Sequence, residues 1–568
     1  MKSIKVALAS PIAAVIGATP EDVHNIMEYP PNPEMGDLAV PCFRFAKALR
    51  QSPQAIAQTI EAVLQDVPEL ASVKAQGGYV NLLLNRSTLM QSVVRTAISN
   101  TESLFSNHRS VGRTAVIDFS SPNIAKPFGV GHLRSTIIGQ SLYRILQADG
   151  YESIGVNHLG DWGTQFGKNI AAYLKWGDEE TVKRDPIREL LSLYVRFHKE
   201  AEHDKALEDE GRLWFKRLEE GDEQAVRLWK WFIEESLTRF RQTYDLLDVK
   251  FDHYLGESFY NDKMEAVVEE LREKHLLVES DGAEVVDLST WNMPPCIIRK
   301  SDGTTIYATR DLAAAIYRHD KLNGSDLLYV VGSEQSLHFQ QVFKVLELMG
   351  KDWSLNCRHI AFGMMKYNGE RLSTRRGKIV YLEDVLNRAI EEASAIIEQK
   401  NSNLADKARI AEQIGIGAVI FNDLKTYRIH DVDFRYEDVL NFDGETGPYV
   451  QYTHARASSV MRKADQKDID VILQDAVFEE TSDAEWNLCL YLAQANESLE
   501  RAVDELDPSV IARYTLHVCH AFNRFYHDNP ILTANSGVRE RRLALTMATK
   551  HVLAYALQLI AIHAPEAM

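Results

Sequence analysis

Short continuous apolar runs alternate with apolar stripes of helical spacing along the middle of the chain. The run 115–117 has the character of a buried parallel strand, and the stripe over 133–146 that of a helix packed on a sheet. Gly129-Val-Gly-His132 lies between the two. A strand, a glycine-bearing turn and a helix N-terminus present backbone N–H groups to phosphate. The pattern therefore predicts a phosphate-handling loop in an α/β sheet.

A second strand–turn–helix pattern follows later in the chain. The apolar run 327–331 leads into Gly332-Ser-Glu-Gln335 and then into another apolar helical stripe. We expect the sheet to resume near residue 295, through a hairpin over 294–307. We also expect a helix to begin at Asp311, a good N-cap residue. Two such halves predict a Rossmann-like, doubly wound sheet with a ligand crevice between them.

The remaining segments differ in their periodicity. One amphipathic helix follows Ser52-Pro53, and a turn at Gly77-Gly78 leads into a strand, which indicates a small α+β domain. The segment around 176–250 has the pattern of a helical insertion, and its aromatic residues are expected in its core. From about 405 the pattern is helical almost throughout. We therefore predict a multidomain α/β protein divided into 1–108, 109–365, 366–445 and 446–568.

Composition narrows the class of protein. At 568 residues, 45% apolar and 25% charged, the chain fits a soluble globular protein of about three to four domains. It has no apolar run of the roughly 18–20 residues that span a bilayer, and its N-terminal apolar run is too short for a secretory signal. Five scattered cysteines without a Cys-x-x-Cys pair favour a reducing cytoplasm and argue against structural zinc. A net charge of −18 counts against general attraction to nucleic acid, although local basic patches still suit an RNA partner.

One basic run stands out from this acidic background. The segment 370–378 carries cationic residues at positions 371, 375, 376 and 378, together with a Ser, a Thr and a Gly. Such a loop suits polyphosphate. A solvated surface loop is the alternative.

Aromatic residues near the two ends of the chain raise the question of RNA binding. Tyr449, Tyr452 and Tyr526 with Arg456 would form a stacking platform for unpaired bases. The spacing alone favours ordinary bundle core instead. Near the N-terminus, Tyr79 and Asn81 alternate with apolar neighbours, so they either face a partner or stand on a solvated strand edge.

Several of these stretches together resemble a known family. Ser121-Pro-Asn-Ile-Ala-Lys126, followed by Gly129-Val-Gly-His-Leu-Arg-Ser-Thr136, resembles the signature region of class I arginyl-tRNA synthetases of the bacterial type. Each motif alone is weak, but the series in this order is specific. The similarity continues through Gly160-Asp-Trp-Gly-Thr-Gln-Phe-Gly167, Tyr307-Ala-Thr-Arg-Asp311, Gly332-Ser-Glu-Gln-Ser-Leu-His-Phe339, the loop 371–377 and Tyr449-Val-Gln-Tyr452.

The resemblance implies an architecture and a reaction. It implies a Rossmann-like catalytic domain, a small N-terminal α+β domain that contacts the tRNA elbow, and a C-terminal all-α bundle that binds the anticodon. Arginine and ATP would form arginyl-adenylate and pyrophosphate, a step that in this family needs tRNA, and the arginyl group would then pass to tRNA(Arg). The implied substrates are L-arginine, tRNA(Arg) and ATP with Mg²⁺. We expect a cytoplasmic monomer with no membrane partner and no protein-bound structural metal.

The resemblance also assigns roles to individual residues. Asp311 and Tyr307 would hold the guanidinium, which needs forked acceptors, while Asp118 would add negative charge or order the loop. The residues assigned to arginine are Asp118, Ser121, Asn123, His132, Tyr307, Asp311 and Gln335. Those assigned to ATP are Gly129, Gly131, His132, Gly332, Glu334, Met365, Arg371 and Ser373. Those assigned to tRNA are Tyr79, Asn81, Tyr449, Tyr452, Arg456, Tyr526 and Met568. The catalytic charges are assigned to His132, Lys126 and Arg375, and no residue is assigned to a metal.

Two departures from the general class I pattern bear on catalysis. Gly129 stands where the first His of His-x-Gly-His is usual, and Thr374 stands where the second Lys of Lys-Met-Ser-Lys-Ser is usual. We hypothesise that Lys126 supplies the missing charge, aided by Arg375 and Arg376. The departures leave two alternatives open, a catalytically inactive tRNA-binding paralogue and another class I nucleotidylyl transferase. ATP–pyrophosphate exchange with arginine, with and without tRNA(Arg), separates them.

Overall fold

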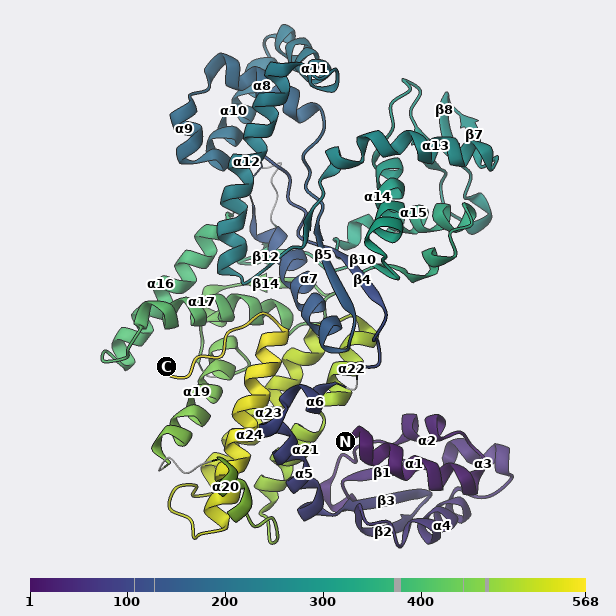
Figure 1. Ribbon diagram of the computed structural model, residues 1–568, viewed down its shortest axis with the longest axis vertical. Helices are drawn as coiled ribbons and strands as arrows, with labels where there is room; N and C mark the ends of the chain where they lie inside the picture. Colours follow the sequence, from purple (N-terminus) through teal and green to yellow (C-terminus); the bar gives the residue numbers. More distant parts are fainter. Residues whose placement is uncertain (107, 127, 372–379, 443, 465–468) are drawn as a thin grey trace.

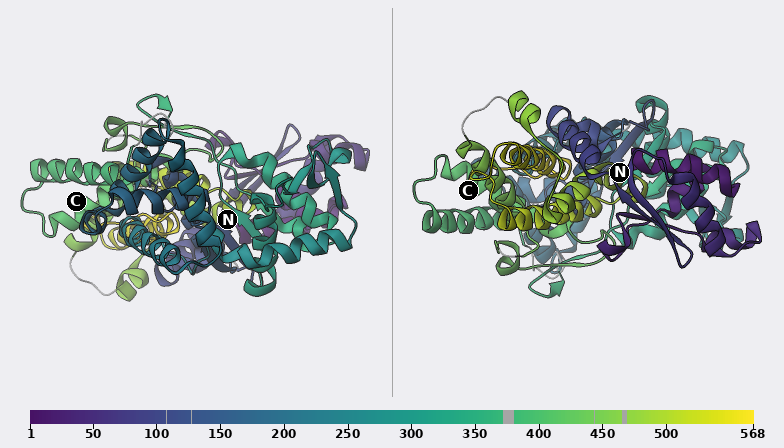
Figure 2. Two further views of the ribbon diagram at one scale, coloured as in Figure 1. Left: turned by 90° about the horizontal axis from the view of Figure 1, so that it is seen from above. Right: turned by 90° about the horizontal axis from the view of Figure 1, so that it is seen from below.

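The computed structural model describes residues 1–106, 108–126, 128–371, 380–442, 444–464 and 469–568. A parallel sheet at its centre carries helical lobes above, a long helical bundle below, and a small α+β unit beside the bundle (Figure 1). Seen from above, the lobe around α13–α15 and the N-terminal unit lie on one side, and α16 and α17 project to the other (Figure 2).

The central sheet has the strand order β11-β10-β4-β5-β6, and its strands pair in parallel. β4 is the expected strand after the N-terminal part, and α7 (Val130–Ala148) follows it. The chain turns from β4 to β5 on one side and reaches β10 on the other, so a crevice opens at the carboxyl ends of β4 and β10. The strands are β4 (Thr114–Asp118), β5 (Glu152–Asn157), β6 (His253–Tyr254), β10 (Asp326–Tyr329) and β11 (Cys357–His359).

The expectation that this sheet resumes near residue 295 is wrong. β9 (Cys296–Arg299) pairs with β8 in a separate antiparallel sheet of order β7-β8-β9. The buried side chains of Cys296 and Ile298 pack into the core of α13–α15 instead. The hairpin over 294–307 is reduced to one bridge between Arg299 and Thr305. The other elements are η2 (Glu257–Lys263), α13 (Met264–Glu273), β7 (Leu277–Ser280), β8 (Ala283–Val286), η3 (Ser289–Trp291), η4 (Ser333–Gln335), α15 (Ser336–Leu348) and η5 (Asp352–Asn356).

The expected helix start at Asp311 is also wrong, because α14 (Tyr307–Leu322) begins four residues earlier. Its N-cap is Ile306, whose backbone is extended and whose side chain makes no capping hydrogen bond. Asp311 therefore lies in the second turn of the helix. This placement puts Asp311 one turn after Tyr307 on the same face.

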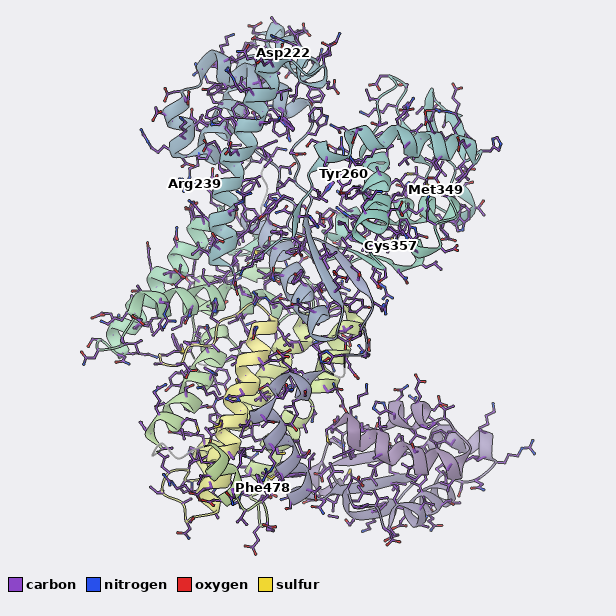
Figure 3. All side chains as sticks on the ribbon, viewed as in Figure 1. Asp222, Arg239, Tyr260, Met349, Cys357 and Phe478 are labelled. Carbon is purple, nitrogen blue, oxygen red and sulfur yellow. The ribbon has the colours of Figure 1, made fainter. Side chains whose placement is uncertain are left out.

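The segment around 176–250 is a helical insertion, as expected. Phe197, Phe232 and Phe240 are fully buried, and Trp214 is nearly so, which confirms the core role of its aromatic residues. In Figure 3, Asp222 caps α12 at the top of this lobe and Arg239 lies further down the same helix. The helices are α8 (Thr164–Trp176), α9 (Glu179–Arg184), α10 (Pro186–Ala201), α11 (Lys205–Glu219) and α12 (Glu223–Leu246).

A second small sheet, of order β13-β12-β14, joins the central sheet to the bundle. The connecting elements are β12 (Met365–Tyr367), β13 (Glu370–Arg371), α16 (Leu382–Lys400), α17 (Lys407–Leu424), β14 (Val432–Phe434) and α18 (Tyr436–Val439). The bundle consists of α19 (Gly447–Lys463), α20 (Ile469–Asp475), α21 (Asp483–Ala493), α22 (Ala495–Glu505), α23 (Ser509–Asp528) and α24 (Val538–Leu559).

The N-terminal unit contains an antiparallel sheet of order β1-β3-β2 and docks on the bundle through α1. The Met1 ammonium donates to the Ala493 carbonyl at 2.6 Å, and Lys5 pairs with Glu497 at 3.2 Å. Ser52 caps α4 by accepting from the Ala55 N–H, as its sequence predicts. The elements are α1 (Lys2–Ile16), α2 (Pro20–Ile26), η1 (Pro33–Met35), β1 (Leu38–Pro41), α3 (Phe43–Leu49), α4 (Pro53–Leu64), β2 (Leu70–Gln76) and β3 (Tyr79–Leu84).

The next two helices, α5 (Arg86–Ser99) and α6 (Thr101–Phe105), pack against the bundle. The buried Asn496 amide donates to the Phe105 carbonyl at 2.7 Å, and the Phe105 ring contacts Tyr514 and Tyr555. The buried hydrophobic residues of the described ranges form two large clusters and a small third one between α16 and α17. The second large cluster holds Tyr260, Met349 and Cys357 around α13–α15 (Figure 3). Within the described ranges no single helix is long and apolar enough to cross a membrane, and one bent pair, Ile4–Ile16 with Pro20–Ile26, passes that test only when its helices are joined.

Candidate active site

The loop between β4 and α7 is held in an unusual backbone conformation. Ser120, Ser121 and Ala125 all have positive φ, at 70°, 47° and 58°. Left-handed conformations are costly for residues with a Cβ and concentrate at functional sites. Hydrogen bonds compensate: the Ser120 N–H donates to Ser135 Oγ at 2.9 Å, and Thr136 Oγ1 donates to Ser120 Oγ at 2.8 Å. The first turns of α7 therefore hold the loop in place.

Asp118, at the end of β4, is committed to partners inside the protein. It pairs with the buried Arg318 of α14 at 2.8 Å and accepts from Ser121 Oγ at 2.8 Å. These are the contacts of a carboxylate that orders a loop, one of the two roles expected for it. Arg318 lies 200 positions away in the sequence, and periodicity gave no indication of it.

Asn123 is fixed by the glycine-rich loop after β5. Asn123 and Gly160 form a parallel bridge, in which the Ile124 N–H donates to the Gly160 carbonyl at 3.1 Å and the Gly160 N–H donates to the Pro122 carbonyl at 3.1 Å. A Cβ on Gly160 would overlap the Asn123 side chain. Close backbone approach therefore requires glycine at this position.

His132 lies in the first turn of α7. The Gly129 N–H donates to His132 Nδ1 at 3.2 Å, and the Gly129 carbonyl already accepts from the His132 N–H at 2.9 Å. Nδ1 also lies 3.3 Å from the Gly129 carbonyl oxygen, to which it donates in the other tautomer; when Nδ1 accepts from the Gly129 N–H, the proton is on Nε2 and that nitrogen is a donor. Burial lowers the pKa of His132, the Gly129 backbone contact raises it, and nearby Lys126 lowers it further, for a net decrease. The imidazole is thus neutral near pH 7.

Asp311 and Tyr307 share a face of α14, as described above. The His338 ring lies 2.6 Å from Asp311, with Nε2 donating to Oδ2, and fixes one oxygen of the carboxylate. Tyr307 is 67% exposed at the helix start. Gln335 ends η4, in the turn after β10, and is also exposed. The structure thus places these residues on neighbouring turns beside β10.

Glu257 is a candidate that sequence reasoning missed. Its closest ionic contact is Arg310 at 3.5 Å. Burial raises its pKa to about 7; Arg310 and Lys126 oppose the increase, and Asp161 and Asp311 add to it. Burial lowers the pKa of Lys126, with Glu257 opposing the decrease. Glu257 follows β6 at the carboxyl edge of the sheet, and that position is the signal that would have found it.

The residues expected to bind ATP flank the start of α7. Ser135 Oγ of α7 donates to the Val330 carbonyl at 2.6 Å and Gly129 bridges Tyr381, so the turn after β10 and the segment after residue 379 both lie near the helix start. Gly332, in that turn, bridges Phe362. Among the described residues, no atom lies within 4 Å of a Cβ built on Gly131. Glu334 is exposed in η4, and Met365 is buried at the start of β12.

Part of the basic run lies outside the described residues. Ser373, Thr374, Arg375 and Arg376 belong to this part, and Arg371 is described only through its backbone in β13. The expected polyphosphate-binding role of this loop therefore stays a prediction.

Four of the residues expected to bind tRNA line one groove of the bundle. Tyr452, Arg456, Tyr526 and Met568 surround a volume of about 610 Å³. The Arg456 guanidinium carbon lies 4.8 Å from the Tyr452 ring centre and 5.2 Å from that of Tyr526. The two rings are 41% and 43% exposed, so the bundle-core interpretation favoured by their spacing is wrong for them.

The other tRNA candidates lie apart from this groove. Tyr449 OH accepts from the Asn523 amide at 3.0 Å, and the same Asn523 accepts from Arg456. Tyr79 and Asn81 are on β3 of the N-terminal unit, beside the lower end of the bundle (Figure 1). β3 is the central strand of its sheet, so the interpretation of a strand edge is wrong.

Fold and site together define a class I aminoacyl-tRNA synthetase. The family model "tRNA synthetases class I (R), catalytic domain" matches residues 94–436, with "Arginyl tRNA synthetase N terminal domain" over 2–84 and "DALR anticodon binding domain" over 450–568. The chain belongs to the arginyl-tRNA synthetase family, and its activity is that of an arginine–tRNA ligase, EC 6.1.1.19. The family, fold class and activity expected from the sequence are thereby confirmed.

Similar proteins cover the whole chain. An arginine–tRNA ligase of Alkaliphilus metalliredigens is 50% identical over 97% of both chains, and one of Clostridioides difficile is 47% identical over 100% of both. Among solved structures, the arginyl-tRNA synthetase of Thermus thermophilus matches with a TM-score of 0.84 at 26% identity over 100% of both chains. That of Plasmodium falciparum matches with a TM-score of 0.82 at 26% identity, over 100% of this chain and 99% of its own.

Proposed function

We propose that arginine and ATP meet in the crevice at the carboxyl ends of β4 and β10. The observation that carries this proposal is the pairing of a strained loop and helix start on β4 with the Asp311 carboxylate, which His338 orients beside β10. A guanidinium requires forked acceptors. Asp311 receives it, and Tyr307, one turn earlier, closes over the substrate side chain.

The other end of arginine is assigned to three amide and hydroxyl groups. Asn123 and Gln335 bind the α-ammonium and carboxylate groups, with Ser121 contributing its hydroxyl. Asp118 acts by holding Ser121, since its own charge is neutralised by Arg318. The Gly160 bridge keeps the Asn123 amide in place.

Adenylate formation is mainly a matter of position and charge. A carboxylate oxygen of arginine attacks the α-phosphorus of ATP, the bond to the bridging oxygen of the β-phosphate breaks, and pyrophosphate leaves. His132 Nε2–H donates to phosphate oxygen, and Lys126, Arg375 and Arg371 neutralise the developing charge. Gly129, Gly131 and Gly332 let ATP approach the backbone, and Ser373, Glu334 and Met365 complete its contacts.

The second step transfers the arginyl group to tRNA. A hydroxyl of the terminal adenosine attacks the carbonyl carbon of the adenylate, and AMP leaves. Tyr452, Tyr526 and Met568 receive anticodon bases in the groove, while Arg456 contacts phosphate. Tyr449 supports Arg456 through Asn523. Tyr79 and Asn81 contact the tRNA elbow.

We also propose how the metal ion takes part, in which oligomeric state the enzyme works and where in the cell it acts. Mg²⁺ enters with ATP as part of the substrate and is held mostly by phosphate and water. Among the described residues, no group of three or more His, Cys, Asp or Glu is arranged to hold a metal ion. We propose that the enzyme works as a monomer in the cytoplasm, without a membrane partner.

ATP–pyrophosphate exchange with arginine tests the proposal. The full chain with tRNA(Arg) should exchange, and omission of tRNA(Arg) or replacement of arginine by lysine should abolish exchange. Exchange that proceeds without tRNA(Arg), or tRNA binding without exchange under any of these conditions, would contradict the proposal.

A further inference from the structure

Arg134 lies two residues after His132 and is 1% exposed. Its Nε donates to Asp423 of α17 at 3.1 Å, and Asp423 is 1% exposed as well. Its two terminal nitrogens donate to three backbone carbonyls, those of Gly363 at 2.7 Å, His430 at 2.8 Å and Arg428 at 3.2 Å. One guanidinium therefore joins α7 to three other segments.

Two of these segments carry the ATP side of the site. The segment through Gly363 bridges Gly332 by way of Phe362, and the Ser333 N–H donates to the Phe362 carbonyl at 3.0 Å. Two residues further on, Met365 begins β12 and pairs with Val432 of β14. The segment through His430 leads directly into that same strand β14.

The packing around this junction leaves little freedom. A Cβ on Gly363 would lie 2.6 Å from the carbonyl carbon and oxygen of His430, so the two backbones are in direct contact. The Gly363 N–H donates to the Arg428 carbonyl at 3.0 Å. A buried charge is expensive unless its partners are well placed. The planar fork of arginine fixes direction as well as distance, which a lysine ammonium does not.

We propose that Arg134 is a positioning residue for ATP: it holds the Gly332 turn and β12 at the correct distance from His132. The inference rests on the proposed ATP-binding roles of Gly332, Glu334 and Met365. Arg134 itself is buried beneath these segments, on the helix that carries His132. It acts on the reaction only through the backbone that it fixes.

A buried arginine elsewhere in the chain, with a similar set of contacts, provides a control that distinguishes a positioning role of Arg134 from a simple contribution to stability. Arg541 of α24 is 3% exposed and makes a similar set of contacts, donating to both oxygens of Glu485 at 3.2 Å and to the Val477 and Glu479 carbonyls. It lies in the first turn of α24, and its contacts join that helix to α21 and to the segment after α20 within the C-terminal bundle. Arg541→Lys therefore imposes a comparable loss of buried contacts without touching the ATP site.

The experiment compares Arg134→Lys and Arg541→Lys in pyrophosphate exchange with tRNA(Arg) present, at equal folded fraction by circular dichroism. We expect Arg134→Lys to lower kcat/KM for ATP by on the order of 10- to 100-fold, the range for small misplacement of reacting groups. The KM for arginine should change less than about twofold, and Arg541→Lys should retain normal kinetics. Asp423→Asn, which keeps the carbonyl contacts, should show a smaller effect in the same direction and serves if Arg134→Lys does not fold.

Equal kinetic losses in the two lysine variants, or equal increases in the KM for ATP and for arginine in Arg134→Lys, would overturn the inference. Glu334→Ala tests the underlying assignment separately. An unchanged KM for ATP in Glu334→Ala would show that the proposed ATP site is wrong, and would remove the basis for the role of Arg134. If Glu334→Ala raises the KM for ATP and Arg134→Lys has the same exchange kinetics as Arg541→Lys, only the positioning role of Arg134 is rejected.

Discussion

Individual charges at the site are compensated to very different degrees. Asp118 has a buried guanidinium at 2.8 Å, whereas Glu257 has Arg310 at 3.5 Å and its pKa rises to about 7. The charge of Lys126 is only partly compensated: burial lowers its pKa, and the nearby Glu257 carboxylate opposes the decrease. A lysine weakly held by one carboxylate can transfer its interaction to phosphate when ATP arrives. Residues of this kind are poised for function rather than for stability.

The charge on Lys126 can be tested directly. Lys126→Ala should reduce pyrophosphate exchange by roughly 100-fold, the usual cost of losing one preorganised charge at a transition state. Arginine affinity should be unchanged, because none of the contacts assigned to arginine involves Lys126. Lys126→Arg should recover part of the activity. Lys168→Ala, which removes a lysine paired with Glu208 at 2.9 Å in the helical insertion, is the control and should exchange normally; near-normal exchange in Lys126→Ala would reject the role.

Glu257 makes a prediction about pH and stability. Its folded pKa of about 7 lies above the ordinary value of 4.5, so the folded state holds the proton more tightly than the unfolded state. Wild-type stability relative to Glu257→Gln should therefore fall as pH rises from about 4.5 to 7, and level off above that window. Unfolding temperatures of both proteins over pH 4–8 measure the difference. A difference that grows with pH in favour of wild type would contradict the assignment.

At the scale of elements, helix stability and the proposed approach of ATP favour different residues at the start of α7. A helix is more stable with alanine than with glycine, yet Gly131 lies in the first turn of α7, where no atom of the described residues would contact a Cβ. The neighbouring Gly129 is the N-cap and bridges Tyr381. Helix stability does not explain glycine at position 131, whereas the proposed approach of ATP to the backbone here would require it.

Gly131→Ala should separate these two requirements. The free energy of unfolding should increase by about 0.5 kcal/mol, since alanine restricts the unfolded chain and fits the helix without strain. The KM for ATP should rise, because the added methyl group occupies the space where phosphate approaches the backbone N–H groups. Thermal unfolding and exchange kinetics are the measurements, with the KM for arginine as the internal control. An increase in stability with an unchanged KM for ATP would show that ATP does not approach here.

At the scale of the whole molecule, what the sequence could predict depended on distance along the chain. The β4–α7 unit and the helical insertion follow from local periodicity, and these were correct. The β9 strand was assigned to the wrong sheet, because an apolar strand does not specify its partner strand. Asp423 lies 289 positions from Arg134, so their pairing was likewise not predictable from the sequence. Motifs identified the family's residues, but not the buried partners that hold them.

The C-terminal tail reaches the groove that we propose receives anticodon bases. Within the bundle, the Gln451 amide donates to the His563 carbonyl at 2.9 Å, His454 Nδ1 donates to that of Pro565 at 2.9 Å, and Arg462 donates to that of Glu566 at 2.7 Å. These contacts anchor the chain up to residue 566 and leave Ala567 and Met568 to line the groove. Removal of the last two residues breaks none of these hydrogen bonds and loses only the packing of the partly buried Met568 side chain against the small cluster around Ile397 and Ile410.

Deleting residues 567–568 should raise the KM for tRNA(Arg) while lowering the unfolding temperature only slightly, because the packing lost is that of one partly buried side chain. Tyr452→Ala should have a larger effect, because base stacking on an aromatic side chain is worth about 1–3 kcal/mol, or roughly 5- to 150-fold. Tyr491→Ala, which removes a partly buried ring against His517 in the same bundle, is the control and should leave the KM for tRNA(Arg) unchanged. Aminoacylation kinetics measure all three variants. If both groove variants keep a normal KM for tRNA(Arg), the groove does not receive anticodon bases, and the exposure of Tyr452 and Tyr526 requires another explanation.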